Sequence, residues 1–305
     1  MPALSDESSF YGSENETANL EEQVSTYDVD HYWTHIHPHL YSTIQHDRLA
    51  IQAQAQASSS TSPNTPSPTT TTTRIIRPDR PSPNEPIPTF LARLPPSTTP
   101  CTSATGPWIY IQSPGYYAPE THIPDLLTQG RRALEHYEEE KSVLEAQRDK
   151  PSTLAKDKSG LTRRLGTLRQ NLEKRIFAIA RAANVVSGKW MLFVTPDKVD
   201  AVWGVVAEET ARGELGSGAK VSTREDGEGA EGRARLVAIY TRDFGDRGEA
   251  ERVVRRLVEL GVVRRGERPI YYKCDAYTYL GIDGRNPWGL RASLFSSRDV
   301  LGERT

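Results

Sequence analysis

The sequence predicts an α+β domain in which helices back a mainly antiparallel sheet. Strand-like segments in the last third of the chain gather aromatic and β-branched residues, and single helices with apolar faces separate them. No Gly-rich nucleotide loop follows any of these segments in the sequence, which disfavours a doubly wound nucleotide-binding fold. We expect one ordered domain over residues 106–300, preceded by a low-complexity, mostly disordered tail over residues 1–105.

The composition limits the classes of protein to which the chain can belong. Its 305 residues have a formal net charge of -2 at pH 7, so the molecule as a whole does not attract nucleic acids or membranes strongly. Cys101 and Cys274 lie far apart in unlike contexts, which fits two free thiols rather than a disulfide framework or a zinc site. The chain starts with acidic residues where a signal peptide needs positive charge, and it has no apolar run long enough to span a bilayer. We therefore expect a cytoplasmic or nuclear protein that does not contact membranes.

The first hundred residues have the composition of a tail. Residues 53–106 are rich in Ser, Thr and Pro, and they cannot bury enough apolar surface to offset their ordering entropy. The histidines from His31 to His39 have no cysteine or paired carboxylate beside them, and Pro38 interrupts them. We interpret them as part of an aromatic-rich segment that docks on the domain or stays mobile, and we expect neither a metal site nor a cofactor.

The ordered region begins with one strand and two helices. Residues 108–112 predict a short strand between Gly-Pro and Pro-Gly turns. A charged helix with an incomplete apolar stripe is expected over residues 124–147. A clearer helix is expected over residues 160–185, because leucines and isoleucines recur there at three- and four-residue steps. The opposite face of this second helix is basic, and we interpret it as a solvated surface rather than a phosphate-binding one.

The C-terminal third alternates strands with helices. Strands are predicted over residues 188–194, 219–223, 236–241 and 271–280, and a further segment at 290–295 follows a turn at Asp283-Gly284. Thr195-Pro196 predicts the start of a helix that ends near Gly213. Asp246 and Glu249 have the spacing of a capping box for a second helix, which ends at Gly261. The apolar residues of each helix fall on one face, which indicates that both helices back the sheet.

Several short motifs in this region resemble, in the same order, those of one protein family. They are Gly188-Lys189-Trp190, Val199-Asp200 with Val202-Trp203, Ala219-Lys220-Val221, the run Ile239 to Phe244 and the run Tyr272 to Thr278. The family is the basophilic leukaemia-expressed protein family, a eukaryotic family of uncharacterised function. The resemblance covers residues 185–298 and, more loosely, residues 108–185, and it leaves the tail outside.

That family is similar in fold to the cap-binding translation initiation factor 4E, which implies a curved antiparallel sheet with helices on its convex face. On this likeness, Tyr240 falls where the factor has a tryptophan beside the cap pocket, and Trp203 falls near the tryptophan of its partner-binding surface. Cap binding needs two aromatic planes around a positively charged guanine. The sequence has no Trp, Tyr or Phe between Gly204 and Leu236, where the second plane should fall, so the resemblance does not carry the cap site over.

We expect a non-enzymatic module that binds RNA or a nucleotide on the concave face of the sheet. Aromatic faces and cations on a sheet suit base stacking and phosphate contacts. Residues 252–298 contain ten basic and four acidic residues, which form either a basic patch or a solvated helix face. We interpret Trp190, Tyr279 and Trp288 as core residues. The candidate ligand-binding residues are Lys189, Lys220, Tyr240, Arg242, Lys273, Tyr277 and Arg291.

Two alternatives from other functional classes stay open. A protein-interaction adaptor would bind a partner on the convex helices around Trp203, and the Ser/Thr/Pro tail would regulate recruitment. An enzyme would use Lys273, Asp275 and Tyr277, which point to one face if residues 271–280 form a strand. The sequence has no histidine beyond His136, which removes the usual general base, so we assign no catalytic residue.

Overall fold

The computed structural model describes residues 78–82, 84–102, 105–151, 154–224 and 232–302. The contacts divide the chain into two compact units, residues 1–72 and 73–305, and every described residue belongs to the second unit. The histidines from His31 to His39 lie outside the described residues, so the interpretation of this segment stays a prediction. None of the helices in the described ranges is long and apolar enough to cross a membrane.

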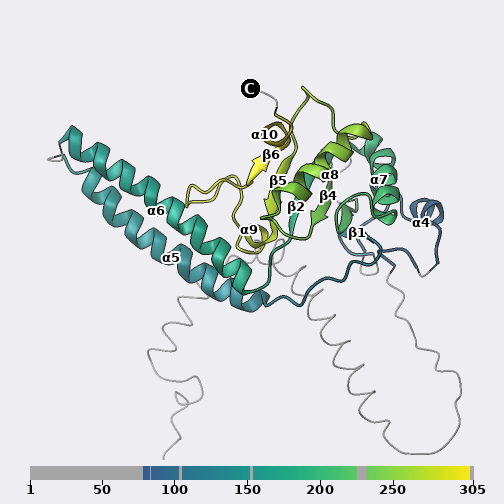
Figure 1. Ribbon diagram of the computed structural model, residues 1–305, viewed down its shortest axis with the longest axis horizontal. Helices are drawn as coiled ribbons and strands as arrows, with labels where there is room; N and C mark the ends of the chain where they lie inside the picture. Colours follow the sequence, from purple (N-terminus) through teal and green to yellow (C-terminus); the bar gives the residue numbers. More distant parts are fainter. Residues whose placement is uncertain (1–77, 83, 103–104, 152–153, 225–231, 303–305) are drawn as a thin grey trace, which may run out of the picture. The chain divides into compact units, whose positions relative to one another are not determined.

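A six-stranded sheet forms the centre of this unit (Figure 1). Its strands lie in the order β1-β3-β4-β2-β5-β6, and all neighbouring strands are antiparallel. The strands are β1 (Trp108–Gln112), β2 (Gly188–Val194), β3 (Gly218–Ser222), β4 (Arg235–Thr241), β5 (Tyr271–Cys274) and β6 (Phe295–Ser296). The predicted α+β class with an antiparallel sheet is therefore confirmed.

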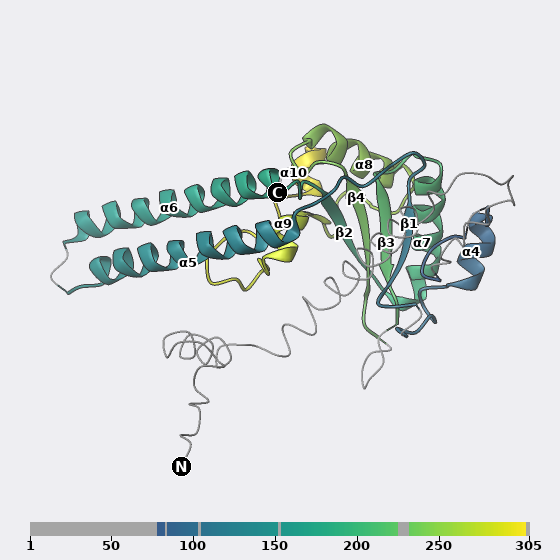
Figure 2. The same cartoon turned by 90° about the horizontal axis from the view of Figure 1, so that it is seen from below.

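Seven helices occur in the described residues. They are α4 (Ile87–Arg93), α5 (Ile123–Arg148), α6 (Ala155–Ala182), α7 (Pro196–Ala211), α8 (Arg247–Glu259), α9 (Asp275–Tyr279) and α10 (Ser297–Leu301). Helices α7 and α8 lie along one face of the sheet, as the two views in Figures 1 and 2 show. We call this side the helix-covered face.

Local sequence signals explain why α8 begins and packs where it does. The Asp246 side chain accepts a hydrogen bond from the backbone N–H of Glu249, as the capping spacing predicts. Val253, Val254 and Leu257 are fully buried, so the apolar side of the helix faces the sheet. The indole Nε1 of Trp190 on β2 donates to the carbonyl oxygen of Ala250 at 2.9 Å, which ties the helix to the central strand.

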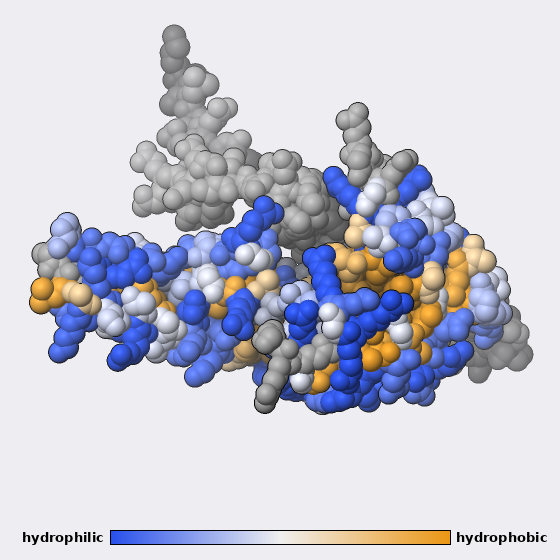
Figure 3. Space-filling view, turned by 90° about the horizontal axis from the view of Figure 1, so that it is seen from above, coloured by the Kyte–Doolittle hydropathy of each residue, from blue (hydrophilic) through white to orange (hydrophobic). Residues whose placement is uncertain are grey.

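Helices α5 and α6 form a long antiparallel hairpin that packs on α9 (Figure 2). The Tyr137 hydroxyl on α5 donates to the backbone oxygen of Trp288 at 3.0 Å, and Ile176 on α6 is fully buried. Hydrophilic residues cover most of the hairpin in the space-filling view of Figure 3, where it lies at the left. This surface agrees with the interpretation of the basic α6 face as solvated.

The predicted boundary at residue 106 places part of the folded unit in the tail. Helix α4 lies within residues 1–105, yet Phe90 is fully buried in the same core as the sheet. Ser97 donates to Asp200 on α7 through its backbone N–H at 2.8 Å and through its hydroxyl at 2.5 Å. The Phe90-Leu91 pair supplies enough apolar area to hold this Pro-rich segment against α7, so residues 84–102 belong with the sheet.

The prediction of a strand over residues 271–280 is wrong in its second half. Strand β5 ends at Cys274, and Asp275 begins the short helix α9. Tyr277 then faces α6, where its hydroxyl donates to Glu173 at 3.2 Å and its ring stacks on Phe177 with centroids 5.5 Å apart. A helical turn therefore replaces the alternation that would have kept Tyr277 on the same side of the sheet as Lys273.

Candidate ligand-binding face

The side of the sheet opposite α7 and α8 carries three lysines among aromatic rings. Alternation along β2 and β4 turns Trp190 and Ile239 toward the helices, and therefore turns Lys189 and Tyr240 to the other side. In the sheet register, Lys189 lies opposite Tyr240 on β4 and opposite Lys273 on β5. We call this side the lysine face, and we define it by Trp108, Tyr110, Lys189, Lys220, Tyr240 and Lys273.

Lys220 on β3 lies between two aromatic rings. Its Nζ is 4.0 Å from the centroid of the Trp108 ring and 5.5 Å from that of the Tyr240 ring, which are cation–π distances. The side chain is half-buried, and within the described residues its ammonium group makes no hydrogen bond or ion pair. Burial, and secondarily the charge of Lys189, lower the pKa of Lys220 to about 7.

Lys189 has the opposite environment, because it is buried and fully paired. Its Nζ lies 2.7 Å from Oδ1 of Asp275 and donates to the Thr278 hydroxyl at 3.1 Å. The other carboxylate oxygen of Asp275 accepts a short hydrogen bond from the Ser187 hydroxyl. Burial opposes ionisation of Asp275, but the Lys189 charge and these hydrogen bonds hold the pKa of the carboxyl below its usual value.

Lys273 and the tyrosines complete the face. Burial first, and then the Lys189 charge, lower the pKa of Lys273. Burial raises the pKa of Tyr110 and that of Tyr240, so both phenols stay neutral hydroxyl groups near pH 7. Asp275 pairs directly with Lys189, and its charge also acts on Lys220 and Lys273 without contacting them.

Two rings of this face were missing from the candidate residues. Trp108 and Tyr110 lie on β1, which pairs with β3 so that Tyr110 is opposite Lys220. The resemblance directed attention to residues between Gly204 and Leu236, whereas the second ring comes from a strand about a hundred residues earlier. The alternation of Trp, Tyr and Gln in β1 indicates one shared face, but it does not identify the neighbouring strand.

Three candidate residues lie away from Lys220 or serve another role. Tyr277 is fully buried on the side of α6, so its assignment to the ligand-binding face is wrong. Arg291 is exposed in the segment between α9 and β6. Arg242 is exposed just past the end of β4, with its guanidinium carbon 6.0 Å from the centroid of the Tyr116 ring.

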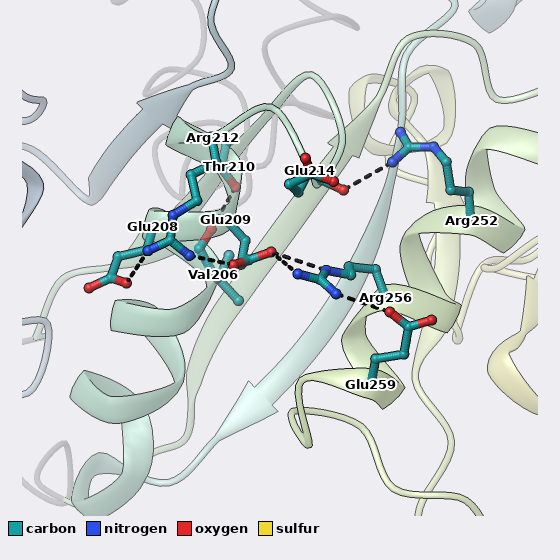
Figure 4. A network of polar contacts seen from close by, with 9 residues as sticks. All are labelled: Val206, Glu208, Glu209, Thr210, Arg212, Glu214, Arg252, Arg256 and Glu259. Carbon is teal, nitrogen blue, oxygen red and sulfur yellow. Dashed lines mark hydrogen bonds and ion pairs between the residues drawn. The ribbon is translucent and has the colours of Figure 1, made fainter.

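The arginines of α8 are held by contacts within the fold. Arg255 and Arg256 pair with carboxylates, and Arg252 donates to the backbone oxygen of Glu214 at 3.0 Å. Figure 4 shows the contacts of Arg252 and Arg256. Arg256 Nη2 lies 2.7 Å from Oε2 of Glu209 on α7, and its Nη1 lies 3.0 Å from Glu259. Arg212 reaches the other oxygen of Glu209 at 2.7 Å. The hydrogen bond from Arg256 is the main reason why the pKa of the buried Glu209 carboxyl is lowered. These charges join α7 to α8, which is a structural role.

Trp203 is part of α7, and its side chain is fully buried in the core. A partner that docks on the outer surface of the helices therefore cannot contact its ring without unfolding α7. The adaptor hypothesis loses the residue on which it depended. The indole Nε1 of Trp203 is buried and has no hydrogen-bond partner in the described part of the chain.

The row of Lys273, Asp275 and Tyr277 that was considered for acid–base chemistry does not form. Asp275 pairs with Lys189, and Tyr277 is turned toward α6, where its hydroxyl donates to Glu173. The described residues contain no group of three or more His, Cys, Asp or Glu side chains that could hold a metal ion. Cys274 is fully buried, and burial raises the pKa of its thiol to about 12.

Comparison with known protein families gives one finding. The model described as basophilic leukemia-expressed protein Bles03 matches residues 20–281, which is well over half of the chain. The match begins much earlier than the motifs from which the resemblance was inferred. It includes the segment from His31 to His39 and helix α4, so the resemblance was wrong to leave the first hundred residues outside the family.

Proposed function

The chain belongs to the basophilic leukemia-expressed protein Bles03 family, and we propose that this member is a non-enzymatic module that binds RNA or a nucleotide on its lysine face. The observation that carries the proposal is the position of Lys220 beside the rings of Trp108 and Tyr240. Base stacking on an aromatic ring contributes about 1–3 kcal/mol per base and tolerates any base, while lysines attract the phosphates.

The charge distribution supports this choice of face over the α8 arginines. Arg256 and Arg212 both pair with Glu209, so they have little free charge to offer a phosphate. Lys220 has no such carboxylate partner in the described residues. A negatively charged ligand would therefore gain most of its electrostatic attraction on the lysine face.

We also propose that the sheet has the fold of translation initiation factor 4E. An antiparallel sheet with α7 and α8 along one face is what that fold implies, and the motifs that carry the resemblance lie on β2, α7, β3, β4 and the β5–α9 segment. A preference for the methylated cap does not follow. Lys220 already lies near both rings, and its charge opposes a second cation there.

Fluorescence anisotropy with the full chain tests the proposal. A single-stranded RNA oligonucleotide, with and without a cap, is titrated at low and at moderate salt. We expect the affinity to fall as salt rises and to be equal for the capped and the uncapped oligonucleotide. Absence of binding at low salt would refute the proposed function, and a cap preference would refute the argument from the Lys220 charge.

One substitution and a matched control locate the binding face. Trp108→Ala removes a stacking ring from the lysine face, and we expect it to weaken binding about tenfold. Tyr117→Ala changes another aromatic residue, which is 87% exposed and lies outside the lysine face, and it should leave the affinity unchanged. Equal affinities of Trp108→Ala and the wild type would show that binding occurs elsewhere.

A further inference from the structure

The Lys220 ammonium lacks the anionic partner that half-buried amines have. It contacts the faces of Trp108 and Tyr240, and no carboxylate, carbonyl or hydroxyl group of the described residues bonds to it. A half-buried amine has lost part of its water, and without a hydrogen bond that loss is not recovered. Lys189 shows the compensated arrangement on the same face, since it contacts Asp275 and Thr278.

The charges of the face do not balance. Lys189, Lys220 and Lys273 carry three positive charges when protonated, and Asp275 supplies one negative charge, so the face has a formal excess of two positive charges. Asp283 acts on Lys273 more strongly than Asp275 does, but it is exposed to solvent and lies in the turn after α9, so it is not counted with the face. Glu249 accepts from the backbone N–H of Arg242 and so lies at the end of β4.

We propose that the lysine face takes a nucleotide with a phosphate monoester, that Lys220 binds this phosphate, and that the complex takes up a proton. This inference rests on the proposed function and names its ligand class. A phosphate monoester carries nearly two negative charges above pH 7, which matches the excess on the face. A phosphodiester carries one negative charge and would leave one positive charge of the face without a counter-charge. Trp108 and Tyr240 are both half-buried beside Lys220, and we assign the base to the exposed part of these side chains.

The expected proton uptake follows from the protonation state of Lys220 before the ligand binds. With a pKa of about 7, most Lys220 amines are neutral at pH 8, and a dianion beside the amine favours its charged form. The other groups that face it are Lys189 on β2, Tyr240 on β4, Tyr110 on β1 and Asp275 on α9. Both tyrosines have raised pKa values and the pKa of Asp275 is lowered, so none of these three exchanges protons between pH 7.5 and 9.

Titration calorimetry with the full chain measures this linkage. Adenosine 5′-monophosphate is titrated at pH 8 in two buffers with different heats of ionisation, and we expect uptake of about one proton per complex. The affinity should fall about tenfold per pH unit between pH 7.5 and 9, where the phosphate itself no longer titrates. Adenosine is the matched ligand without the phosphate, and we expect it to bind at least tenfold more weakly.

Variants identify the amine. Lys220→Arg keeps a positive charge at every pH tested, so it should bind with an affinity independent of pH over the same range. Lys220→Met should lose the preference for the monophosphate over adenosine. Lys273→Arg should retain the pH dependence of the wild type, because Lys220 remains. Lys198→Met, exposed on α7, is the control for a distant lysine and should change nothing.

The outcomes separate this inference from the proposed function. RNA that binds equally well with a 5′-phosphate and a 5′-hydroxyl group, together with a flat pH profile, would overturn the inference and leave the proposed function standing. No binding of RNA or monophosphate would overturn both. Binding of the 5′-phosphorylated RNA with proton uptake would support the inference and, if the free monophosphate fails to bind, identify the RNA end as the source of the phosphate.

Discussion

The two faces of the sheet carry charged residues in opposite ways. On the helix-covered face, Glu209 is buried between Arg256 and Arg212, and each charge has a partner (Figure 4). On the lysine face, Lys189 has Asp275, whereas the contacts of the Lys220 ammonium within the described residues are with aromatic rings. The number of charges along the chain favours the arginine-rich segment as a binding site, yet the half-buried lysine without an ion-pair partner among the described residues lies on the other side. The presence or absence of ion-pair partners therefore indicates the binding site better than the number of charged residues in a segment does.

Lys189→Met should have the largest effect on stability among the changes that test this contrast. It leaves Asp275 buried without its counter-charge, and we expect a loss of about 3–5 kcal/mol in the free energy of unfolding. Urea denaturation at pH 7 measures this loss, with Lys198→Met as an exposed control that stays within about 0.5 kcal/mol. A loss below about 1 kcal/mol would show that water compensates Asp275.

Arg256→Ala tests the pairing on the helix-covered face. It removes one of the two arginines that hold Glu209, and we expect destabilisation of about 1–2 kcal/mol, since Arg212 stays in place. Arg255→Ala, at the neighbouring position, breaks an exposed pair with Glu251, which lies four residues before Arg255, and it should cost less than about 0.5 kcal/mol. Equal effects of the two substitutions in thermal or urea unfolding would contradict the structural role of Glu209.

Of these three substitutions, Lys220→Met should change the free energy of unfolding least. It should stabilise the protein, whereas Lys189→Met and Arg256→Ala should destabilise it. The pKa of Lys220 is lowered in the folded state, so below about pH 7 the folded protein carries the full cost of the charged amine. Between pH 7 and the ordinary lysine pKa, the unfolded chain binds more protons, and wild-type stability rises with pH. We expect the variant to be more stable by about 1 kcal/mol at pH 7, with a smaller gain at pH 9.

Urea unfolding at both pH values measures that change. Lys220→Arg is the control, since its charge persists at both pH values. A destabilising effect of Lys220→Met at pH 7 would show that the cation–π contacts outweigh the cost of burying the amine.

Local patterns in the sequence predicted much of the fold. The strands over residues 108–112 and 188–194 have the predicted bounds, and α8 begins at the Asp246 cap. These features depend on alternation, capping and apolar periodicity, which act over a few residues. The family also follows from sequence motifs alone, although its match extends further toward the N-terminus than those motifs indicate.

The predictions that proved wrong concern features that depend on contacts between residues far apart in the chain. Residues 275–279 leave the strand, with Asp275 bonded to Ser187 and Lys189, which lie nearly ninety residues earlier. Trp203 looked like a surface residue because a likeness to another protein cannot report the packing of this core. The sequence does not indicate that Arg256 of α8 is paired, because its partner Glu209 lies on another helix.

The sequence by itself determined most of the strand residues, which side of the sheet they occupy in β1, β2 and β4, and which helices back the sheet. Only the tertiary structure decided that β1 lies beside β3, and so brought the Trp108 ring to Lys220. The reason is physical. Alternation and caps are encoded within a few residues, whereas strand order and charge pairing result from packing between segments far apart in the chain, where many arrangements share the same local pattern.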